Sequence, residues 1–241
     1  MSTFVIGDIH GGLKALPQVL KRANVTEKDT LIFLGDYVDG WSEAAQTIDF
    51  LIALSKTTHC IFIKGNHDLW CENWLKTKRQ EPVWLAHGGQ ATLKSYTSYS
   101  VTKKQEHISF FEQMKPYHIN SNNRLFIHAG YTSIHGVEKE TFKMNYFFDR
   151  TLWEMAFAMD KALHKEAIGY PDRFKHYHEI YIGHTPTIRY QSTTPINVAN
   201  LWNLDTGAAF TGRLSIMNIK HKKFWQSDIV KELYPNEKGR N

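Results

Sequence analysis

The amino-acid sequence predicts an α/β fold built around a parallel sheet. Two observations support this prediction: short runs of β-branched and aromatic residues recur through the N-terminal half, and stretches with helical spacing separate them. Strands that alternate with helices in this way form right-handed βαβ units, and their parallel strands are buried on both faces. The chain has 241 residues, 42% of them hydrophobic, which is enough for one domain with a sizeable core.

The N-terminal elements follow from local patterns. Leu13, Leu16 and Val19 share one face of the first helical stretch. Ser42 precedes the second helical stretch and is its expected N-cap residue. The predicted strands span 3–8, 30–36 and 60–66, and the predicted helices between them span 13–23 and 42–55.

The middle and the end of the chain differ from the N-terminal part. Residues from about 69 to 123 mix tryptophans with polar side chains and helical spacing, which predicts a helical insertion that caps one end of the sheet. Residues 1–228 are expected to form a single domain, and residues 229–241 a polar, frayed C-terminal tail. Later apolar runs predict a second, mixed sheet with strands at 124–130, 179–185, 201–207 and 213–219.

Composition narrows the functional classes. A net charge of +5 spread along the chain is compatible with nucleic acid or with any phosphorylated substrate and does not choose between them. We expect no nucleic-acid polymer as a partner. Two cysteines do not make a disulfide scaffold. Residues 1–8 read as a strand rather than a signal peptide, and no apolar run reaches the roughly 20 residues of a membrane helix. We therefore expect a cytoplasmic protein with no membrane partner.

Potential metal ligands follow five of the predicted strands. Taken alone, an aspartate after a strand is more often a helix N-cap, and a histidine there is more often a hydrogen-bonded loop residue. Together they matter, because ligands bind at the carboxyl ends of strands in open α/β sheets. Carboxylate and amide oxygens mixed with imidazoles suit a pair of Mn, Fe or Zn ions. The residues are Asp8 and His10, Asp36 and Asp39, Asn66 with His67 and Asp68, His128, and His184.

The ordered motifs "GDIHG", "GDYVDG", "GNHD", "HAG" and "GHT" resemble the signature of the calcineurin-like metallophosphoesterases. Within that superfamily, the chain is most similar to the bacterial and phage type of serine/threonine phosphoprotein phosphatase, from Gly7 to about Leu214. The resemblance implies a four-layer α/β/β/α sandwich with two divalent metal ions at the edge of the sheets. Manganese is the expected metal, with iron or zinc as alternatives.

The resemblance also assigns roles to individual residues. Its implied mechanism is direct attack of a metal-bound hydroxide on phosphorus, without a covalent intermediate. His67 would be the general acid, and Asp39 would orient its imidazole. The implied metal ligands are Asp8 and His10 for the first ion, Asp36 as the bridge, and Asn66, His128 and His184 for the second ion.

Four features concern the substrate phosphate and the surroundings of the metals. The related phosphatases carry a phosphate-binding arginine where this chain has Gly40. Either another cation reaches the phosphate, or the substrate is not a phosphoprotein. Arg150 in "YFFDRTLW" resembles a second phosphate-binding arginine of the bacterial proteins. Asp68 stands where glutamate is commoner and is expected only to support the ligands. Residues 83–96 are expected to wall the cleft, either as packing or with His87 contacting substrate.

These features leave three functions open. The first is a serine/threonine protein phosphatase that hydrolyses phosphomonoesters. The second is a symmetrical dinucleoside-tetraphosphate hydrolase, whose cap aromatics would stack on adenines. The third is a binding module for phosphorylated ligands that has lost its chemistry; it predicts a broken ligand set or a missing acid, and the sequence shows neither.

Overall fold

The computed structural model describes residues 1–240 as an α/β fold with two mixed sheets of five strands each. In the first sheet the order is β10-β9-β1-β2-β3, and β1, β2 and β3 are parallel as predicted. Its strands are β1 (Thr3–Ile6), β2 (Thr30–Phe33), β3 (His59–Phe62), β9 (Ser215–Asn218) and β10 (Phe224–Gln226).

The second sheet has a parallel centre and antiparallel edges. Its order is β4-β5-β6-β8-β7; β5, β6 and β8 are parallel, whereas β4 and β7 run antiparallel to their neighbours. The strands are β4 (Tyr117–Ile119), β5 (Arg124–Ile127), β6 (Glu179–Ile182), β7 (Ile196–Val198) and β8 (Leu201–Asn203).

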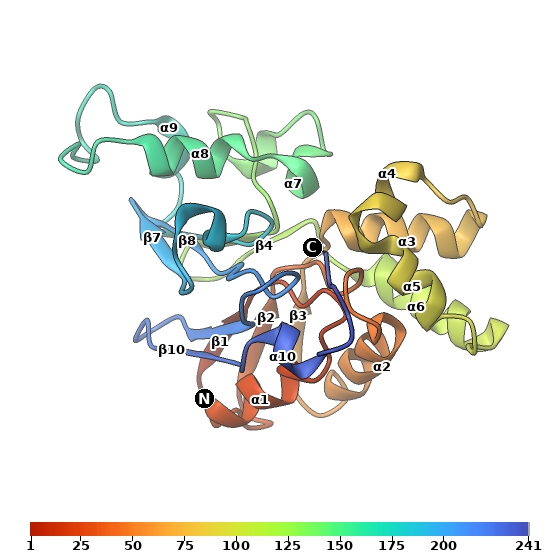
Figure 1. The fold of residues 1–241 in the computed structure, drawn as a ribbon. Helices are drawn as coiled ribbons and strands as arrows, with labels where there is room; N and C mark the ends of the chain where they lie inside the picture. The colour runs from red at the N-terminus through yellow and green to blue at the C-terminus, as the bar shows by residue number, and fades with distance from the viewer. Residues whose placement is uncertain (241) are drawn as a thin grey trace.

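The two sheets lie face to face between two layers of helices (Figure 1). Alternation along the strands builds these layers, because successive side chains point to opposite faces. In β1, Phe4 and Ile6 pack toward the first helical layer, whereas Val5 packs between the sheets. The first helical layer holds α1 (Ala15–Arg22) and α2 (Ala44–Leu54), and the second holds α7 (Asn145–Phe148), α8 (Thr151–Ala158) and α9 (Asp172–Lys175).

A helical group covers one side of this sandwich, as Figure 1 shows in orange to yellow-green. It spans residues 66–113, whereas the helical insertion was expected at about 69–123. Residues 117–119 nevertheless form β4 of the second sheet, because they pair antiparallel with the adjacent β5 in a hairpin. The group comprises α3 (Asn66–Thr77), α4 (Pro82–Trp84), a π-helical turn (Leu85–Gly89), α5 (Gln90–Ser95) and α6 (Val101–Gln113).

The structure corrects three further expectations. The strand predicted at 213–219 is β9, which belongs to the first sheet and pairs antiparallel with β1. Ser42 does not cap α2; its hydroxyl donates to Glu237 instead, at 2.7 Å. The C-terminal segment is not frayed up to residue 240, because α10 (Val230–Leu233) and Tyr234 pack against the first helical layer.

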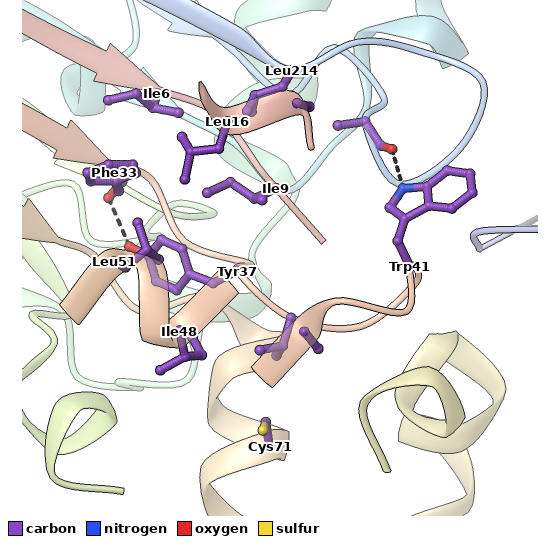
Figure 2. Close-up of a cluster of buried hydrophobic side chains, with 14 of the residues drawn as sticks. Ile6, Ile9, Leu16, Phe33, Tyr37, Trp41, Ile48, Leu51, Cys71 and Leu214 are labelled. Atoms are coloured by element: carbon purple, nitrogen blue, oxygen red, sulfur yellow. Dashed lines mark hydrogen bonds between the residues drawn. The ribbon is translucent and has the colours of Figure 1, made fainter. Parts of the chain in front are cut away.

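Trp41 anchors that segment. The side chain is fully buried, and its indole Nε1 donates to the carbonyl of Ala208 at 2.8 Å (Figure 2). Its ring stacks on Tyr234 with 5.3 Å between the ring centres and 21° between the planes. The C-terminal segment is thereby held beside the loop that follows β2.

Candidate active site

The predicted site residues converge at the carboxyl ends of β1, β2, β5 and β6 and in the first turn of α3. The loops after these strands are tight. His10, Asp36, Asp39 and His184 all have positive φ values, between 53° and 70°, a conformation that side chains adopt rarely and that clusters at functional sites. The side chains are buried, none more than 9% exposed: Asp8, His10, Asp36, Asp39, Asn66, His67, His128 and His184.

Asp36 lies at the centre of the cluster. Its Oδ2 is 3.5 Å from Nε2 of His10 and 3.4 Å from Nε2 of His128. Two groups of potential ligand atoms, each within 4.8 Å, share this carboxylate: one joins it to His10 and His67, the other to His128 and His184. A carboxylate common to two groups is the arrangement expected of a ligand that bridges two ions.

The remaining two predicted ligands complete these groups. Oδ2 of Asp8 lies 3.9 Å from Nε2 of His10. Oδ1 of Asn66 lies 3.2 Å from Nε2 of His128 and 3.0 Å from Nδ1 of His184. The structure therefore brings together all six residues that the sequence assigned to metal binding.

The electrostatics of the cluster fit a bound cation. Burial, together with the nearby Asp205 and Asp36, raises the pKa of Asp8 well above its ordinary value. Burial also lowers the pKa of His10 and of His184 well below the usual range, so both imidazoles are neutral and can act as ligands. Burial acts to raise the pKa of Asp36, but His128 and His67 outweigh it and lower that pKa.

Two buried atoms of the cluster also lack a partner among the described residues: Oδ1 of Asp8 and Nε2 of His184. A buried carboxylate oxygen without a partner is costly unless a proton or a cation satisfies it. Gly183 has no side chain at this point, and a Cβ there would lie 2.0 Å from that oxygen of Asp8. The donor set and its unmet atoms fit divalent metal ions.

Backbone carbonyls orient two of the imidazoles. Nδ1 of His10 lies 3.2 Å from the carbonyl of Val38, and Nδ1 of His128 lies 2.8 Å from that of Leu34. These contacts leave Nε2 of each ring facing Asp36. Such outer contacts fix the tautomer and the ring position of metal-binding histidines.

His67 has a different environment from the other histidines. Its Nδ1 lies 2.6 Å from Oδ2 of Asp39, as the resemblance implied. Trp84 Nε1 donates to the same oxygen at 2.7 Å, and the hydroxyl of Thr92 donates to Oδ1 at 2.5 Å. The sequence assigned the segment of Trp84 and Thr92 to packing or substrate contact at the wall of the cleft, and it did not indicate either residue as a partner of Asp39.

Asp68 ties the loops together. Its carboxylate accepts hydrogen bonds from the backbone N–H groups of Gly65, Asp36 and Tyr37, at 2.8 to 2.9 Å. Burial and the charge of Asp36 raise its pKa to about 7. The residue thus supports the loop that carries Asp36, which agrees with its expected supporting position.

A pocket of about 140 Å³ opens onto the cluster. Arg150 lies in it, as expected of a phosphate-binding residue, and its Nη1 donates to Thr185 at 3.0 Å. Arg240 also lies in it, which the sequence did not indicate, because residues 229–241 were expected to be frayed. The pocket is lined by Asp36, Asn66, His67, Trp70, His87, Phe148, Arg150, His184 and Arg240.

A model of the calcineurin-like phosphoesterases matches residues 1–206, most of the chain. The chain belongs to this family. Members typically bind two divalent metal ions, and this calcineurin-like phosphoesterase carries the candidate ligand groups described above. The family also makes the chain an enzyme of the metallophosphoesterase class, so the alternative of a non-catalytic binding module is not supported.

Its relatives are named for a different substrate from the one the sequence motifs favoured. An asymmetrical bis(5'-nucleosyl)-tetraphosphatase of Oceanobacillus iheyensis is 27% identical over 244 residues, covering 93% of this chain and 91% of the relative. A Bacillus anthracis protein of the same name is 27% identical over 238 residues, with 88% of each chain covered.

Solved structures share the fold. A putative diadenosine tetraphosphatase superposes with a TM-score of 0.62 at 16% identity, covering 93% of this chain and 91% of that one. A serine/threonine phosphatase of Saccharomyces cerevisiae gives 0.61 at 15% identity, covering 92% and 74%. These likenesses confirm the predicted fold. Among residues 1–240, no helix is long and apolar enough to cross a membrane.

Proposed function

We propose that this metallophosphoesterase hydrolyses dinucleoside tetraphosphates with the aid of two divalent metal ions, manganese being the expected metal. The relatives named for that activity, aligned over nearly the whole chain, are the observation that carries the proposal. The sequence favoured a phosphoprotein substrate, but none of these relatives supports one.

The buried cluster would hold the metals. When bound, the two ions supply a water of lowered pKa for attack and neutralise charge on the phosphoryl oxygens. Asp36 would be the shared ligand, because it belongs to both groups of donor atoms. Its partners would be Asp8 and His10 for one ion and Asn66, His128 and His184 for the other.

Two side chains of the pocket act on the substrate itself. The guanidinium of Arg150 binds phosphoryl oxygens, for which its planar fork of donors is suited. His67 is bound to Asp39 through Nδ1, so its Nε2 is the atom that donates a proton to the departing oxygen.

The shape and walls of the site favour a substrate longer than a phosphomonoester. Trp70 stands edge-on to His67, with 5.0 Å between the ring centres, and Phe148 packs on Trp70 at 5.6 Å. A second hollow of about 360 Å³ is lined in part by Gly40 and Gly88, and Arg240 lines both hollows. A polyphosphate chain with a base at each end would use both the aromatic surface and the second hollow.

The test is a direct comparison of substrates with manganese present. Diadenosine tetraphosphate products are separated by anion-exchange chromatography, and phosphate release is measured from a phosphothreonine peptide. We expect kcat/KM to be higher for the dinucleotide, with ATP and AMP as the products of asymmetrical cleavage. ADP as the sole product would instead support the symmetrical hydrolase. A higher kcat/KM for the peptide would overturn the proposal in favour of a protein phosphatase.

A further inference from the structure

Arg240 reaches the candidate active site from the far end of the described chain. Its side chain is half-buried, and it lines the pocket together with Arg150, His67 and Asn66. A second guanidinium therefore faces the place where the substrate binds.

The segment that carries Arg240 is fixed at several points. The N–H of Arg240 donates to the carbonyl of Ala209 at 2.9 Å. Further back, Tyr234 stacks on Trp41, and Glu237 accepts hydrogen bonds from the N–H and the hydroxyl of Ser42. Figure 1 shows this segment in dark blue, running from α10 back toward α3. These contacts hold the Arg240 backbone in one position.

Two glycines make room for the Arg240 stem. A Cβ added to Gly40 would lie 3.2 Å from Cγ of Arg240, and a Cβ added to Gly88 would lie at the same distance from that atom. Both glycines also have positive φ values, of 103° and 102°, which disfavour any side chain there. An arginine or another side chain at either position would therefore press against the Arg240 stem.

Within residues 1–240 the guanidinium has few partners. Its Nε is buried and donates no hydrogen bond to any of these residues, and no carboxylate among them lies within 4.0 Å of its nitrogen atoms. Its contact with Phe210 is a cation–π approach of 5.3 Å. An arginine that is held by its backbone and lies in an active-site pocket without an ion-paired carboxylate is available to bind an anion.

We propose that Arg240 is a phosphate-binding residue of this active site and acts beside Arg150. The C-terminal segment delivers the guanidinium that Gly40, in the loop after β2, does not supply. Trp41, the residue after Gly40, does not fill the missing arginine's place, because its ring points to Ala208 and Tyr234. The inference rests on phosphate binding in this pocket and does not depend on which phosphoester is the substrate.

The test uses Arg240→Gln and Arg240→Lys, with Lys231→Gln as the matched control. Lys231 is exposed on α10 of the same segment and does not line the pocket. Lys231→Gln therefore removes the same charge as Arg240→Gln without changing the pocket. The first readout is the Kd of inorganic phosphate for the manganese-loaded protein, measured by titration calorimetry. The second is kcat/KM for p-nitrophenyl phosphate, with and without millimolar guanidinium. The third is the thermal unfolding midpoint.

We expect Arg240→Gln to weaken phosphate binding about 10- to 100-fold, the usual worth of a hydrogen bond to a charged group. We expect kcat/KM to fall by a similar factor, and guanidinium to restore part of it. Arg240→Lys should retain more binding than Arg240→Gln, and the unfolding midpoint should stay unchanged in all three variants.

An unchanged phosphate Kd in Arg240→Gln, or a loss equal to that in Lys231→Gln, would overturn the inference. So would a lowered unfolding midpoint without rescue by guanidinium, because it would show a structural role. The effect of Arg240→Gln on phosphate binding can be judged separately from the identity of the substrate. A protein that ignores dinucleotides but loses phosphate binding in Arg240→Gln refutes the proposed function and supports this inference.

Discussion

Nδ1 of His67 lies 2.6 Å from Oδ2 of Asp39, and that oxygen also accepts a hydrogen bond from Trp84. The pairing fixes the plane of the imidazole. It also leaves Nε2 as the free ring atom, 4.0 Å from Oδ2 of Asp36 at the centre of the metal-ligand cluster. The proposed proton donor is thus held beside the expected metal site by a carboxylate that itself has two further side-chain donors, on Trp84 and Thr92.

Replacing His67 tests the assignment of the general acid. His67→Asn should lower kcat on an alkyl phosphomonoester by roughly 10²- to 10⁴-fold. The loss should be smaller on p-nitrophenyl phosphate, because an aryl leaving group needs less protonation. Steady-state kinetics on both substrates give the answer, and equal losses on the two would contradict the assignment.

Removing the indole N–H of Trp84, which donates to Asp39, tests whether this hydrogen bond helps Asp39 to orient His67. Trp84→Phe keeps the aromatic bulk and deletes the N–H that lies 2.7 Å from Oδ2. We expect kcat to fall about 10-fold, with the inhibition constant of inorganic phosphate unchanged. Trp74→Phe is the control, because Trp74 packs on Trp84 with 5.7 Å between the ring centres and makes no hydrogen bond to Asp39. An equal loss of kcat in both variants would point to general packing damage.

The aromatic surface formed by Trp70 and Phe148 should affect the binding of a dinucleotide more than that of a small substrate. Trp70→Leu should raise KM for diadenosine tetraphosphate by about 10-fold or more, since stacking of a base on an aromatic side chain is worth about 1–3 kcal/mol. KM for an alkyl phosphomonoester should change little. Phe142→Leu, at a side chain that is 64% exposed and outside the pocket, controls for loss of an aromatic ring. An equal KM change on both substrates would exclude stacking at Trp70.

Glu140 gives a prediction on stability that is independent of function. Burial acts to raise its pKa, but hydrogen bonds from the backbone of Thr132, Phe142 and Ser133 outweigh it and lower the pKa to about 2. A lowered carboxyl pKa stabilises the fold above the unfolded pKa of about 4.3, and this contribution is lost as the pH falls toward 2.

Glu140→Gln should therefore reduce the free energy of unfolding by about 2–3 kcal/mol at pH 7. Urea denaturation at several pH values measures the difference, which should narrow as the pH falls below about 4. Glu138→Gln, at an exposed position of the neighbouring turn, is the matched control and should show little change. A difference between Glu140→Gln and the parent protein that does not vary with pH would contradict the account.

The metal-ligand cluster was predictable because its signals are local. Each ligand follows a short apolar strand, and parallel strands bring their carboxyl ends to one edge whatever the details of the loops. Asp8, Asp36 and His184 could be placed in this way before any contact was known. The three parallel strands β1, β2 and β3 were predictable for the same reason.

The missed features depend on long-range contacts. The apolar run within residues 213–219 predicts a strand but does not say whether that strand pairs with β1 or with β8. Arg240 lies about 200 positions from Gly40, and its place depends on the stacking of Tyr234 on Trp41 and on the bond to Ala209. No pattern within the C-terminal segment encodes those partners.

The central claim of the proposed function is that Asp36 is shared by two metal ions and that His67 is a proton donor rather than a ligand. The metal content of three proteins tests this claim most directly, because His67 lies close enough to Asp36 and His10 to be a ligand itself. Parent protein, Asp36→Asn and His67→Asn are loaded with manganese, desalted, and assayed by mass spectrometry of acid digests. The account predicts about two ions per chain in the parent protein and in His67→Asn, and a loss of both ions in Asp36→Asn. A single ion in the parent protein, or the loss of an ion in His67→Asn, would contradict it.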